Sequence, residues 1–322
     1  MKALIRDRYG PPDVLEVRDV EHPVPKEGEV LVRVHAASIN DWDWGLLQRP
    51  PPLAFNRRAP RVKILGSDIA GRVAAVGSGA TRFRVADEVH GDLSRFGFGG
   101  WGGFAEYVCA PERALVLKPA SMTFEQAAAL PQAGQLAVQG LFAGGPLKPG
   151  MQILINGAGG GVGTIAIQLA KLQEVEVTGV DRASKLGMMK SLGFNHVIDY
   201  EQEDFTRSGK RYDLILDTKT SRSPFAYARA LNPGGTYATV GGVETQLLNH
   251  LIFGWWIRRT TNKRFRIVIL KQNKDLPYLN ERFEAGRLVP VIDGPYELDA
   301  AREAFRHFGA GHHKGKIVIT MA

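Results

Sequence analysis

A glycine-rich turn between an apolar strand and a helix constrains the fold of this chain more than any other feature. Residues 152–156 have the apolar pattern of a buried strand, and the seven residues after them are Gly157, Ala158, Gly159, Gly160, Gly161, Val162 and Gly163. Such a turn lets the backbone approach a pyrophosphate, and the helix that follows offers free N–H groups and the positive end of its dipole. We therefore predict that residues 157–163 bind a dinucleotide.

The spacing of the glycines supports this interpretation. The strict Gly-x-Gly-x-x-Gly pattern is absent, but Ala158, Gly160 and Gly163 have its spacing, and Gly157, Gly160 and Gly163 recur every third residue. A glycine cluster alone is a weak signal, and a purely structural turn is the alternative. A strand before the cluster and a helix after it form the context that the motif requires, and this favours dinucleotide binding.

Alternating strand and helix patterns continue from this turn to residue 240. Strands are predicted at residues 152–156, 174–180, 196–199, 212–217 and 235–240. Helices are predicted between them, near residues 162–172, 185–192 and 224–231. Alternation of this kind builds a parallel sheet with helices on both faces. We therefore predict an α/β fold with a doubly wound parallel sheet.

The first third of the chain has a different pattern, of short strands between turn signals. Strands are predicted at residues 2–6, 29–35, 71–77 and 85–91, which indicates a small barrel or sandwich. An alanine-rich helix capped by Ser121 or Thr123 opens the second domain. After residue 288 strand-like runs return around a helix at 299–308, and we expect this tail to rejoin the first domain. The predicted domains are 1–121 with 286–322, and 122–285.

Composition excludes several classes of protein. The single cysteine, Cys109, excludes an intrachain disulfide and a structural zinc site built on several thiolates. No apolar run approaches the roughly 20 residues of a membrane-spanning helix, and residues 1–7 lack the apolar segment of a secretory signal. We therefore expect a cytoplasmic protein without a membrane partner.

The formal net charge of +8 is spread along the chain. It indicates either a solvated basic surface or a field that attracts anionic ligands such as a nucleotide phosphate. Binding of nucleic acid needs a basic patch or a motif, and neither is found in the sequence. We therefore expect a small-molecule substrate and no nucleic-acid partner.

The choice between NAD and NADP depends on the residues after the second strand of the α/β domain. Asp181 lies about 20 residues after the glycine turn, where an acid accepts hydrogen bonds from the adenosine ribose, which favours NAD. Arg182 and Lys185 beside it could hold a 2′-phosphate, which favours NADP. Lys185 could instead be a solvated helix residue. These residues leave the choice open.

Several stretches together resemble a known family. They are residues 9–15, 34–43, 66–71, 102–108, 128–131, 232–235 and 315–319, and they span nearly the whole chain. Their order and spacing are similar to those of the zinc-independent medium-chain dehydrogenase/reductase superfamily, in its quinone oxidoreductase-like branch. The resemblance implies a GroES-like β-barrel catalytic domain, a Rossmann NAD(P)-binding domain, and hydride transfer in the cleft between them.

The resemblance also has implications for cofactor and assembly. Many relatives use NADPH, which shifts our expectation to NADP(H) over NAD(H). It places Val240, Gly241 and Gly242 at the nicotinamide end of the cofactor. Many relatives are homodimers, and the apolar strand at 265–270 could be a sheet edge that pairs across a twofold axis.

Departures from the family pattern concern the metal and the catalytic contacts. Zinc-dependent relatives have a cysteine and a histidine–glutamate pair as ligands, and the corresponding positions here are Asn40 and Ser67–Asp68. We therefore expect no metal. A tyrosine of the quinone reductase pattern is replaced by Trp44, and a threonine that often contacts the nicotinamide is replaced at Gln135.

The candidate catalytic residues lie together at 40–44. Asn40 could donate a hydrogen bond to the substrate or the carboxamide, or it could be a turn residue that bonds its own backbone. Trp42 and Trp44 could form the walls of a pocket for a flat substrate, or they could be packing residues. Asp43 is expected to be a structural acceptor more than a base. A second aromatic stretch, at 251–257, could line a pocket, form a dimer contact or be a buried helix.

These features predict an NAD(P)H-dependent, zinc-independent oxidoreductase that reduces quinones or α,β-unsaturated carbonyl compounds. Conjugate reduction spreads charge onto an enolate, which hydrogen-bond donors can stabilise without a metal. The alternatives are a zinc-free alcohol or aldehyde reductase and a non-catalytic NADPH-binding redox sensor.

Overall fold

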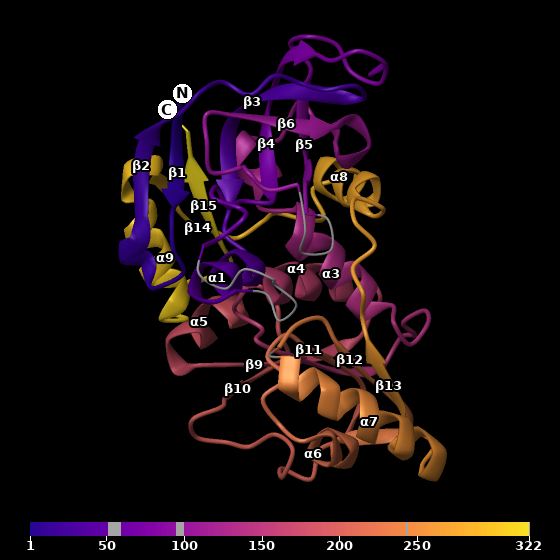
Figure 1. Ribbon diagram of the computed structural model, residues 1–322. Helices are drawn as coiled ribbons and strands as arrows, with labels where there is room; N and C mark the ends of the chain where they lie inside the picture. Colours follow the sequence, from indigo (N-terminus) through magenta and orange to yellow (C-terminus); the bar gives the residue numbers. More distant parts are fainter. Residues whose placement is uncertain (51–58, 95–99, 243, 322) are drawn as a thin grey trace. The chain divides into compact units, whose positions relative to one another are not determined.

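The structure, a computed structural model, describes residues 1–50, 59–94, 100–242 and 244–321, and the chain divides into two compact units (Figure 1). The first comprises Met1–Ala133 and Gln272–Ala322, and the second comprises Gly134–Lys271. The sequence predicted boundaries at 121/122 and 285/286 instead. Two flanking helices account for the difference, because α2 (Phe124–Ala128) packs against the strands of the first unit and α8 (Leu276–Glu284) is bonded to it through Asn280, which contacts buried His90 at 3.1 Å.

The first unit is built mainly from antiparallel strands. In a seven-stranded sheet the order is β14-β15-β3-β4-β5-β7, with β6 also paired to β3, while β1 and β2 form a separate pair. The bounds are β1 Lys2–Arg6, η1 Pro12–Val14, β2 Leu15–Asp19, β3 Glu29–Ser38, α1 Asp41–Gln48, β4 Asp68–Val76, β5 Glu88–Asp92, β6 Tyr107–Pro111, η2 Glu112–Ala114, β7 Val116–Leu117, α3 Pro131–Leu141 (which crosses the unit boundary), β14 Ile292–Glu297, η3 Leu298–Ala300, α9 Ala301–Gly309 and β15 Lys316–Thr320.

The core of the first unit follows from the periodicity of its strands and last helix. Val30, Val32 and Val34 alternate along β3 and are buried, as expected for a strand with one face on a core. On α9 the buried Ala304 and Phe305 lie on the helix face that packs inward, and Phe305 makes an edge-to-face contact with Phe104 at 5.6 Å. The C-terminal tail therefore completes the core of the N-terminal domain.

The second unit contains a six-stranded parallel sheet in the order β10-β9-β8-β11-β12-β13. Its elements are β8 Gln152–Asn156, α4 Gly161–Lys171, β9 Glu176–Asp181, α5 Ala183–Ser191, β10 His196–Asp199, β11 Tyr212–Asp217, α6 Pro224–Arg229, β12 Leu231–Thr239, α7 Glu244–Thr260 and β13 Arg264–Ile267. The predicted doubly wound sheet is confirmed. In this topology the order reverses between β8 and β11, and ligands bind at the carboxyl ends of the strands beside that point.

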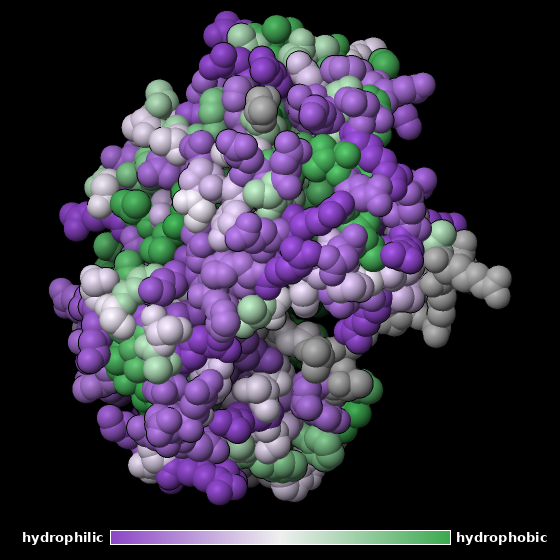
Figure 2. All heavy atoms as spheres, turned by 90° about the vertical axis from the view of Figure 1, so that its left-hand side faces the viewer, coloured by the Kyte–Doolittle hydropathy of each residue, from purple (hydrophilic) through white to green (hydrophobic). Residues whose placement is uncertain are grey.

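One face of the molecule, shown in Figure 2, carries mainly hydrophilic side chains, with hydrophobic patches between them. Within the described ranges, no helix combines the length and the apolar character needed to cross a membrane.

The turn between β8 and α4 depends on the missing side chain of Gly163. A β-carbon at Gly163 would overlap the backbone of Ala158, so helix and turn can approach this closely only at glycine. We predict that Gly163→Ala lowers the free energy of unfolding by about 1–3 kcal/mol, as overpacking of a filled site does, and weakens NADPH binding. Urea unfolding and cofactor titration measure the two effects.

Gly187→Ala is the matched control, because Gly187 lies inside α5 and a β-carbon there has no neighbour within 4 Å. Alanine at this position is expected to stabilise the chain by about 0.5–1 kcal/mol through helix propensity. Equal effects of the two substitutions would contradict the packing role of Gly163.

Candidate functional site

The glycine turn presents backbone amides at the start of α4. Gly157 has a φ of +83°, and Gly160 is the N-cap of the helix. Among the described residues, no acceptor is found for the amides of Gly161, Val162 and Gly163. These are the unsatisfied groups of a helix N-terminus, where anions bind.

Asp181, at the end of β9, holds the turn in place. Its Oδ2 accepts the Gly159 amide at 2.9 Å, and its Oδ1 accepts the Arg182 amide at 2.9 Å. The ammonium of Lys185 lies 3.6 Å from Oδ1. Three donors therefore surround this buried carboxylate, which fixes the glycine turn through the Gly159 amide.

Lys185 is not the solvated helix residue that the sequence allowed. Its side chain is buried, and burial lowers its pKa from the ordinary value although Asp181 opposes the shift. The Cδ atom of Lys185 lies 2.6 Å from where a β-carbon of Gly159 would stand. Lys185 thus lies against the glycine turn.

Arg182 lies at the same strand end but is more exposed. Its guanidinium donates to the hydroxyl of Tyr200 at 3.3 Å. Tyr200 directly follows β10, the strand beside β9, so the parallel sheet brings the two side chains together. Nothing in the local pattern around Tyr200 indicated this contact.

A further segment of the site, the loop after β11, was missed in the sequence. Buried Asp217 accepts hydrogen bonds from the Asn156 side chain at 2.8 Å, from the Thr220 amide at 3.0 Å and from the Tyr237 hydroxyl at 2.8 Å. Lys219 in this loop has its Cε 3.1 Å from where a β-carbon of Gly157 would stand. An acid at the last position of a buried apolar strand, Asp217 of β11, was the signal that could have found this loop.

The predicted nicotinamide segment lies at the same end of the sheet. The Val240 amide donates to the carbonyl of Asp217 at 3.0 Å, and Gly241 accepts the hydroxyl of Thr239 at 2.7 Å. Gly242 has a φ of +122°, and a β-carbon there would lie 2.5 Å from Thr220. The structure therefore brings the predicted segments at 157–163, 181–185 and 240–242 to one edge of the sheet.

In the first unit, Asn40 and Asp43 are buried at the start of α1, where the resemblance implied a loop. Asn40 is the N-cap, and its backbone N–H donates to Asp43 Oδ2 at 2.9 Å. Asp43 Oδ1 accepts the Gly66 amide at 2.8 Å. Burial is the main cause that raises the pKa of Asp43 to about 7, and the two backbone donors oppose it. Asp43 thus accepts two backbone amides at the start of α1, and its expected role as a structural acceptor more than a base stays a prediction.

A buried lysine holds the side chain of Asn40. Lys316 Nζ donates to Asn40 Oδ1 and to the Ile39 carbonyl at 3.0 Å, and lies 3.6 Å from Asp68 Oδ2. With its oxygen engaged by the ammonium, Asn40 directs its Nδ2 toward Ser67 Oγ at 3.4 Å. The amide is therefore oriented as a hydrogen-bond donor. Lys316 lies in the stretch 315–319 that resembles the family, but nothing in the local sequence indicated its contact with Asn40.

Trp44 occupies a packing position. Its ring lies 6.2 Å from that of Phe308, and a β-carbon at Gly309 would overlap it. Trp42, by contrast, is half exposed. The pocket role predicted for Trp44 stays a prediction, and packing against α9 is what the structure adds.

Comparisons with known proteins identify the family. Residues 26–120 match the alcohol dehydrogenase GroES-like domain, and residues 192–319 match the zinc-binding dehydrogenase family. The chain is 32% identical to a 2-methylene-furan-3-one reductase of Solanum lycopersicum, over 99% of this chain and 79% of that protein. It is 31% identical to an NADPH-dependent alkenal/one oxidoreductase of Arabidopsis thaliana, over the same shares. A quinone oxidoreductase structure from Coxiella burnetii superposes with a TM-score of 0.89 at 28% identity, covering 100% and 99% of the two chains.

The chain belongs to the quinone oxidoreductase-like branch of the medium-chain dehydrogenase/reductase superfamily. Its first unit is the GroES-like domain and its second the Rossmann domain, so the predicted family and fold class are confirmed. As a member of this branch the protein is an NAD(P)H-dependent oxidoreductase.

The zinc positions of the superfamily carry donors that do not suit the metal. Asn40 and Ser67 replace thiolate and imidazole, and the carboxylate of Asp68 faces the ammonium of Lys316 at 3.6 Å. Zn²⁺ in catalytic sites takes cysteine, histidine and carboxylate ligands, and a buried ammonium among the donors would repel it. No cluster of three or more histidine, cysteine or acidic side chains fit to hold a metal occurs in the part of the chain that the structure describes.

Asp92 makes the stability of this reductase depend on pH. It is buried beside its sheet partner Asp68, and its Oδ2 lacks a hydrogen-bond partner within the described residues. Burial, and then the charge of Asp68, raises the pKa of Asp92 to about 7. An unfolded aspartate titrates near pKa ~3.9, so the contribution of Asp92 to the free energy of unfolding falls as pH rises from about 4 to about 7.

Asp92→Asn removes this titration. We predict that the variant gains stability relative to the unmodified protein between pH 5 and pH 8, as measured by urea unfolding at both values. The exposed Asp19 supplies the control, since Asp19→Asn should leave the difference between the two pH values unchanged. A parallel pH dependence in the unmodified protein and the Asp92 variant would contradict the assignment.

Proposed function

We propose that this protein reduces quinones or α,β-unsaturated carbonyl compounds with NADPH and without a metal. The observation that carries the proposal is the buried contact of Lys316 with Asn40, which puts an oriented amide donor at the position where zinc-dependent relatives have a metal ligand. The names of the relatives, an enone reductase, an alkenal/one oxidoreductase and a quinone oxidoreductase, support the same substrate class.

The residues at the edge of the Rossmann sheet fit a dinucleotide with an additional phosphate. The amides of Gly161, Val162 and Gly163 would hold the pyrophosphate. Lys185 and Lys219 flank the turn, and Arg182 stands with Tyr200 beside the ribose position. Asp181 is occupied with the loop, so cations predominate there and favour the 2′-phosphate of NADPH.

The chemistry that the chain itself supplies is orientation and hydrogen bonding. Bound NADPH supplies the hydride. Asn40 Nδ2 donates to the carbonyl oxygen on which negative charge develops, and the neighbouring ammonium of Lys316 strengthens that donor by polarising the amide. Asp43 holds the start of α1, and water supplies the proton to the product.

We also propose that the protein is a homodimer. Strand β13 forms one edge of the six-stranded sheet, so its outer backbone groups can pair with the same strand of a second copy. The cytoplasmic localisation predicted from the sequence stays a prediction.

A panel of electron acceptors tests the proposed activity. We expect sustained NADPH oxidation with enones and quinones and little with simple aldehydes, because without a metal only the conjugated acceptors spread the developing charge. Asn40→Ala should lower kcat by about 10²–10³-fold, the usual effect of removing one oxyanion donor. Steady-state absorbance of NADPH measures both.

Asn40→Ser is the control for the loss of the N-cap, because serine retains a capping hydroxyl at the start of α1. A preference for aldehydes would favour the alcohol or aldehyde reductase. Binding of NADPH without turnover on any acceptor would favour a redox sensor.

Substitution of Arg182 tests the cofactor. Arg182→Ala should weaken the binding of NADPH by about 1.5–3 kcal/mol, which is the contribution of a charged hydrogen bond to a phosphate. The binding of NADH should be nearly unaffected. Nicotinamide fluorescence titration gives both dissociation constants. Lys190→Ala, an exposed lysine at the other end of α5, is the control. Equal losses of binding affinity for the two cofactors would contradict the assignment of Arg182 to the 2′-phosphate.

A further inference from the structure

Helix α7 exposes an apolar stripe. Leu248, Leu251, Ile252 and Trp255 recur at helical spacing and are each more than half exposed, with Leu251 at 61%, and Trp256 beside them is also exposed. We name these five residues the α7 stripe. The stretch at 251–257 is therefore not the buried helix that the sequence allowed. Contiguous apolar surface of this kind marks a binding face on a soluble domain.

The opposite side of α7 already has its packing partners. His250 and Ile257 are buried, and His250 stacks on Tyr237 with ring centroids 5.2 Å apart. Gly254 brings the helix against Phe265 of β13, because a β-carbon there would lie 2.9 Å from that side chain. The α7 stripe is thus the outward face of a helix whose inner face is fixed to the sheet.

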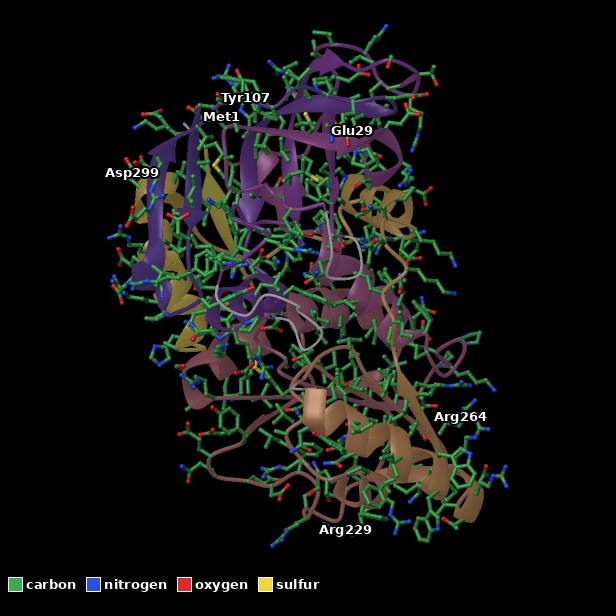
Figure 3. The ribbon with its side chains drawn as sticks, in the orientation of Figure 1. Met1, Glu29, Tyr107, Arg229, Arg264 and Asp299 are labelled. Carbon is green, nitrogen blue, oxygen red and sulfur yellow. The ribbon has the colours of Figure 1, made fainter. Side chains whose placement is uncertain are left out.

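Cations surround the stripe. From Pro224 to Lys271 the sequence has a single acid, Glu244, and seven basic residues, which are Arg229, Arg258, Arg259, Lys263, Arg264, Arg266 and Lys271. The guanidinium of Arg259 lies over the ring of Trp255 at 4.6 Å. Figure 3 shows Arg229 and Arg264, from α6 and β13, projecting from this end of the Rossmann unit.

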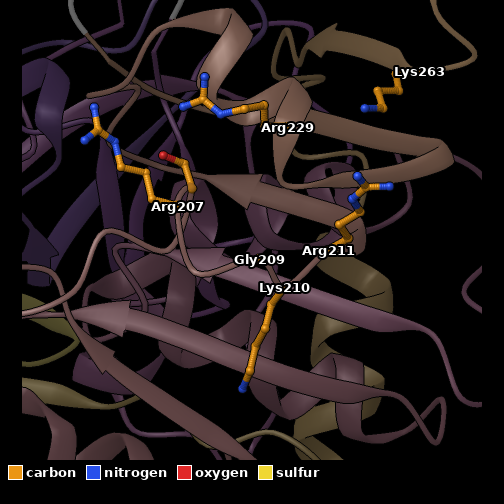
Figure 4. A pocket seen from close by; sticks show the side chains of 7 residues that line it. Arg207, Gly209, Lys210, Arg211, Arg229 and Lys263 are labelled. Atoms are coloured by element: carbon orange, nitrogen blue, oxygen red, sulfur yellow. The ribbon is translucent and has the colours of Figure 1, made fainter.

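A basic pocket lies at the same corner (Figure 4). It has a volume of about 650 Å³, and its lining includes Arg207, Lys210, Arg211, Arg229 and Lys263. Lys263, which lies between α7 and β13, donates to the Ala228 carbonyl of α6. Phe225 of α6 packs on Phe253 and Trp256 of α7 at 5.4 and 5.9 Å. These contacts join α6, which carries Arg229 of the pocket, to α7, which carries the stripe.

We propose that this α6–α7 surface docks on an anionic lipid bilayer, with the α7 stripe in the headgroup region and the cations against lipid phosphates. Apolar and aromatic side chains rimmed by lysine and arginine are what an interfacial helix presents to such a surface. The α7 stripe of a second copy is a less well matched occupant, since a symmetric contact of stripe on stripe would place Arg258 and Arg259 of both copies around one patch. This inference is independent of the reaction, and it revises the expectation of no membrane partner.

The experiment uses the full chain and vesicles. Phosphatidylcholine vesicles are compared with vesicles that also contain phosphatidylglycerol, and bound protein is measured by co-sedimentation and by the blue shift of tryptophan fluorescence. We expect at least about tenfold tighter binding to the anionic vesicles, weakened by added salt. No binding, or equal binding to both compositions, would overturn the proposal.

Two pairs of variants locate the contact. Leu251→Asn with Ile252→Asn, and Arg258→Glu with Arg259→Glu, should each abolish binding to the anionic vesicles. The controls are Val24→Asn with Val85→Asn, which replaces apolar residues of the first unit that are also more than half exposed, and Arg113→Glu. Both controls should bind as the unmodified protein does. If the Leu251 and Ile252 change leaves vesicle binding intact but dissociates a dimer in lipid-free buffer, the stripe is a contact between copies and the proposal is wrong.

Discussion

Close approach of backbone to backbone at the turn after β8 is the constraint on which the cofactor site depends. No β-carbon fits between Gly163 and Ala158, so α4 begins directly against the strand that precedes it. Its first free amides consequently stand at the carboxyl ends of the strands. Asp181 then fixes the turn through the Gly159 amide, and Lys185 lies along the space that a side chain at Gly159 would fill. Each later feature of the site is built on that approach.

The first unit buries several charged side chains away from solvent. A buried ammonium is costly unless it is paired and hydrogen-bonded, and Lys316 is both, through Asp68, Asn40 and the Ile39 carbonyl. The same contacts orient the Asn40 amide. Asp92 is less well compensated, and burial, together with the charge of Asp68, raises its pKa to about 7.

The pattern of the sequence predicted the parallel sheet well and its surroundings less well. Strands β8, β10 and β11 have the predicted bounds because each is a short apolar run that ends at a polar residue. Strand β12 begins at Leu231, four residues earlier than predicted. Its first residues include a proline and two glycines, which are typical of a turn, and its pairing with β11 is irregular between Tyr212 and Leu214. The unit boundaries differ because the packing of α2 and the hydrogen bonds of Asn280 in α8, and not composition, assign these helices to the first unit.

Sequence alone determined the glycine turn between strand and helix, the doubly wound sheet and the family, because local spacing of glycines and apolar residues carries that information. Only the tertiary structure decided which distant side chains meet. The contact of Lys316 with Asn40 joins residues 276 positions apart, and Tyr200 reaches Arg182 across neighbouring parallel strands. It also decided that α7 turns its apolar side outward, since helical periodicity gives the faces of a helix but not which of them the sheet will cover.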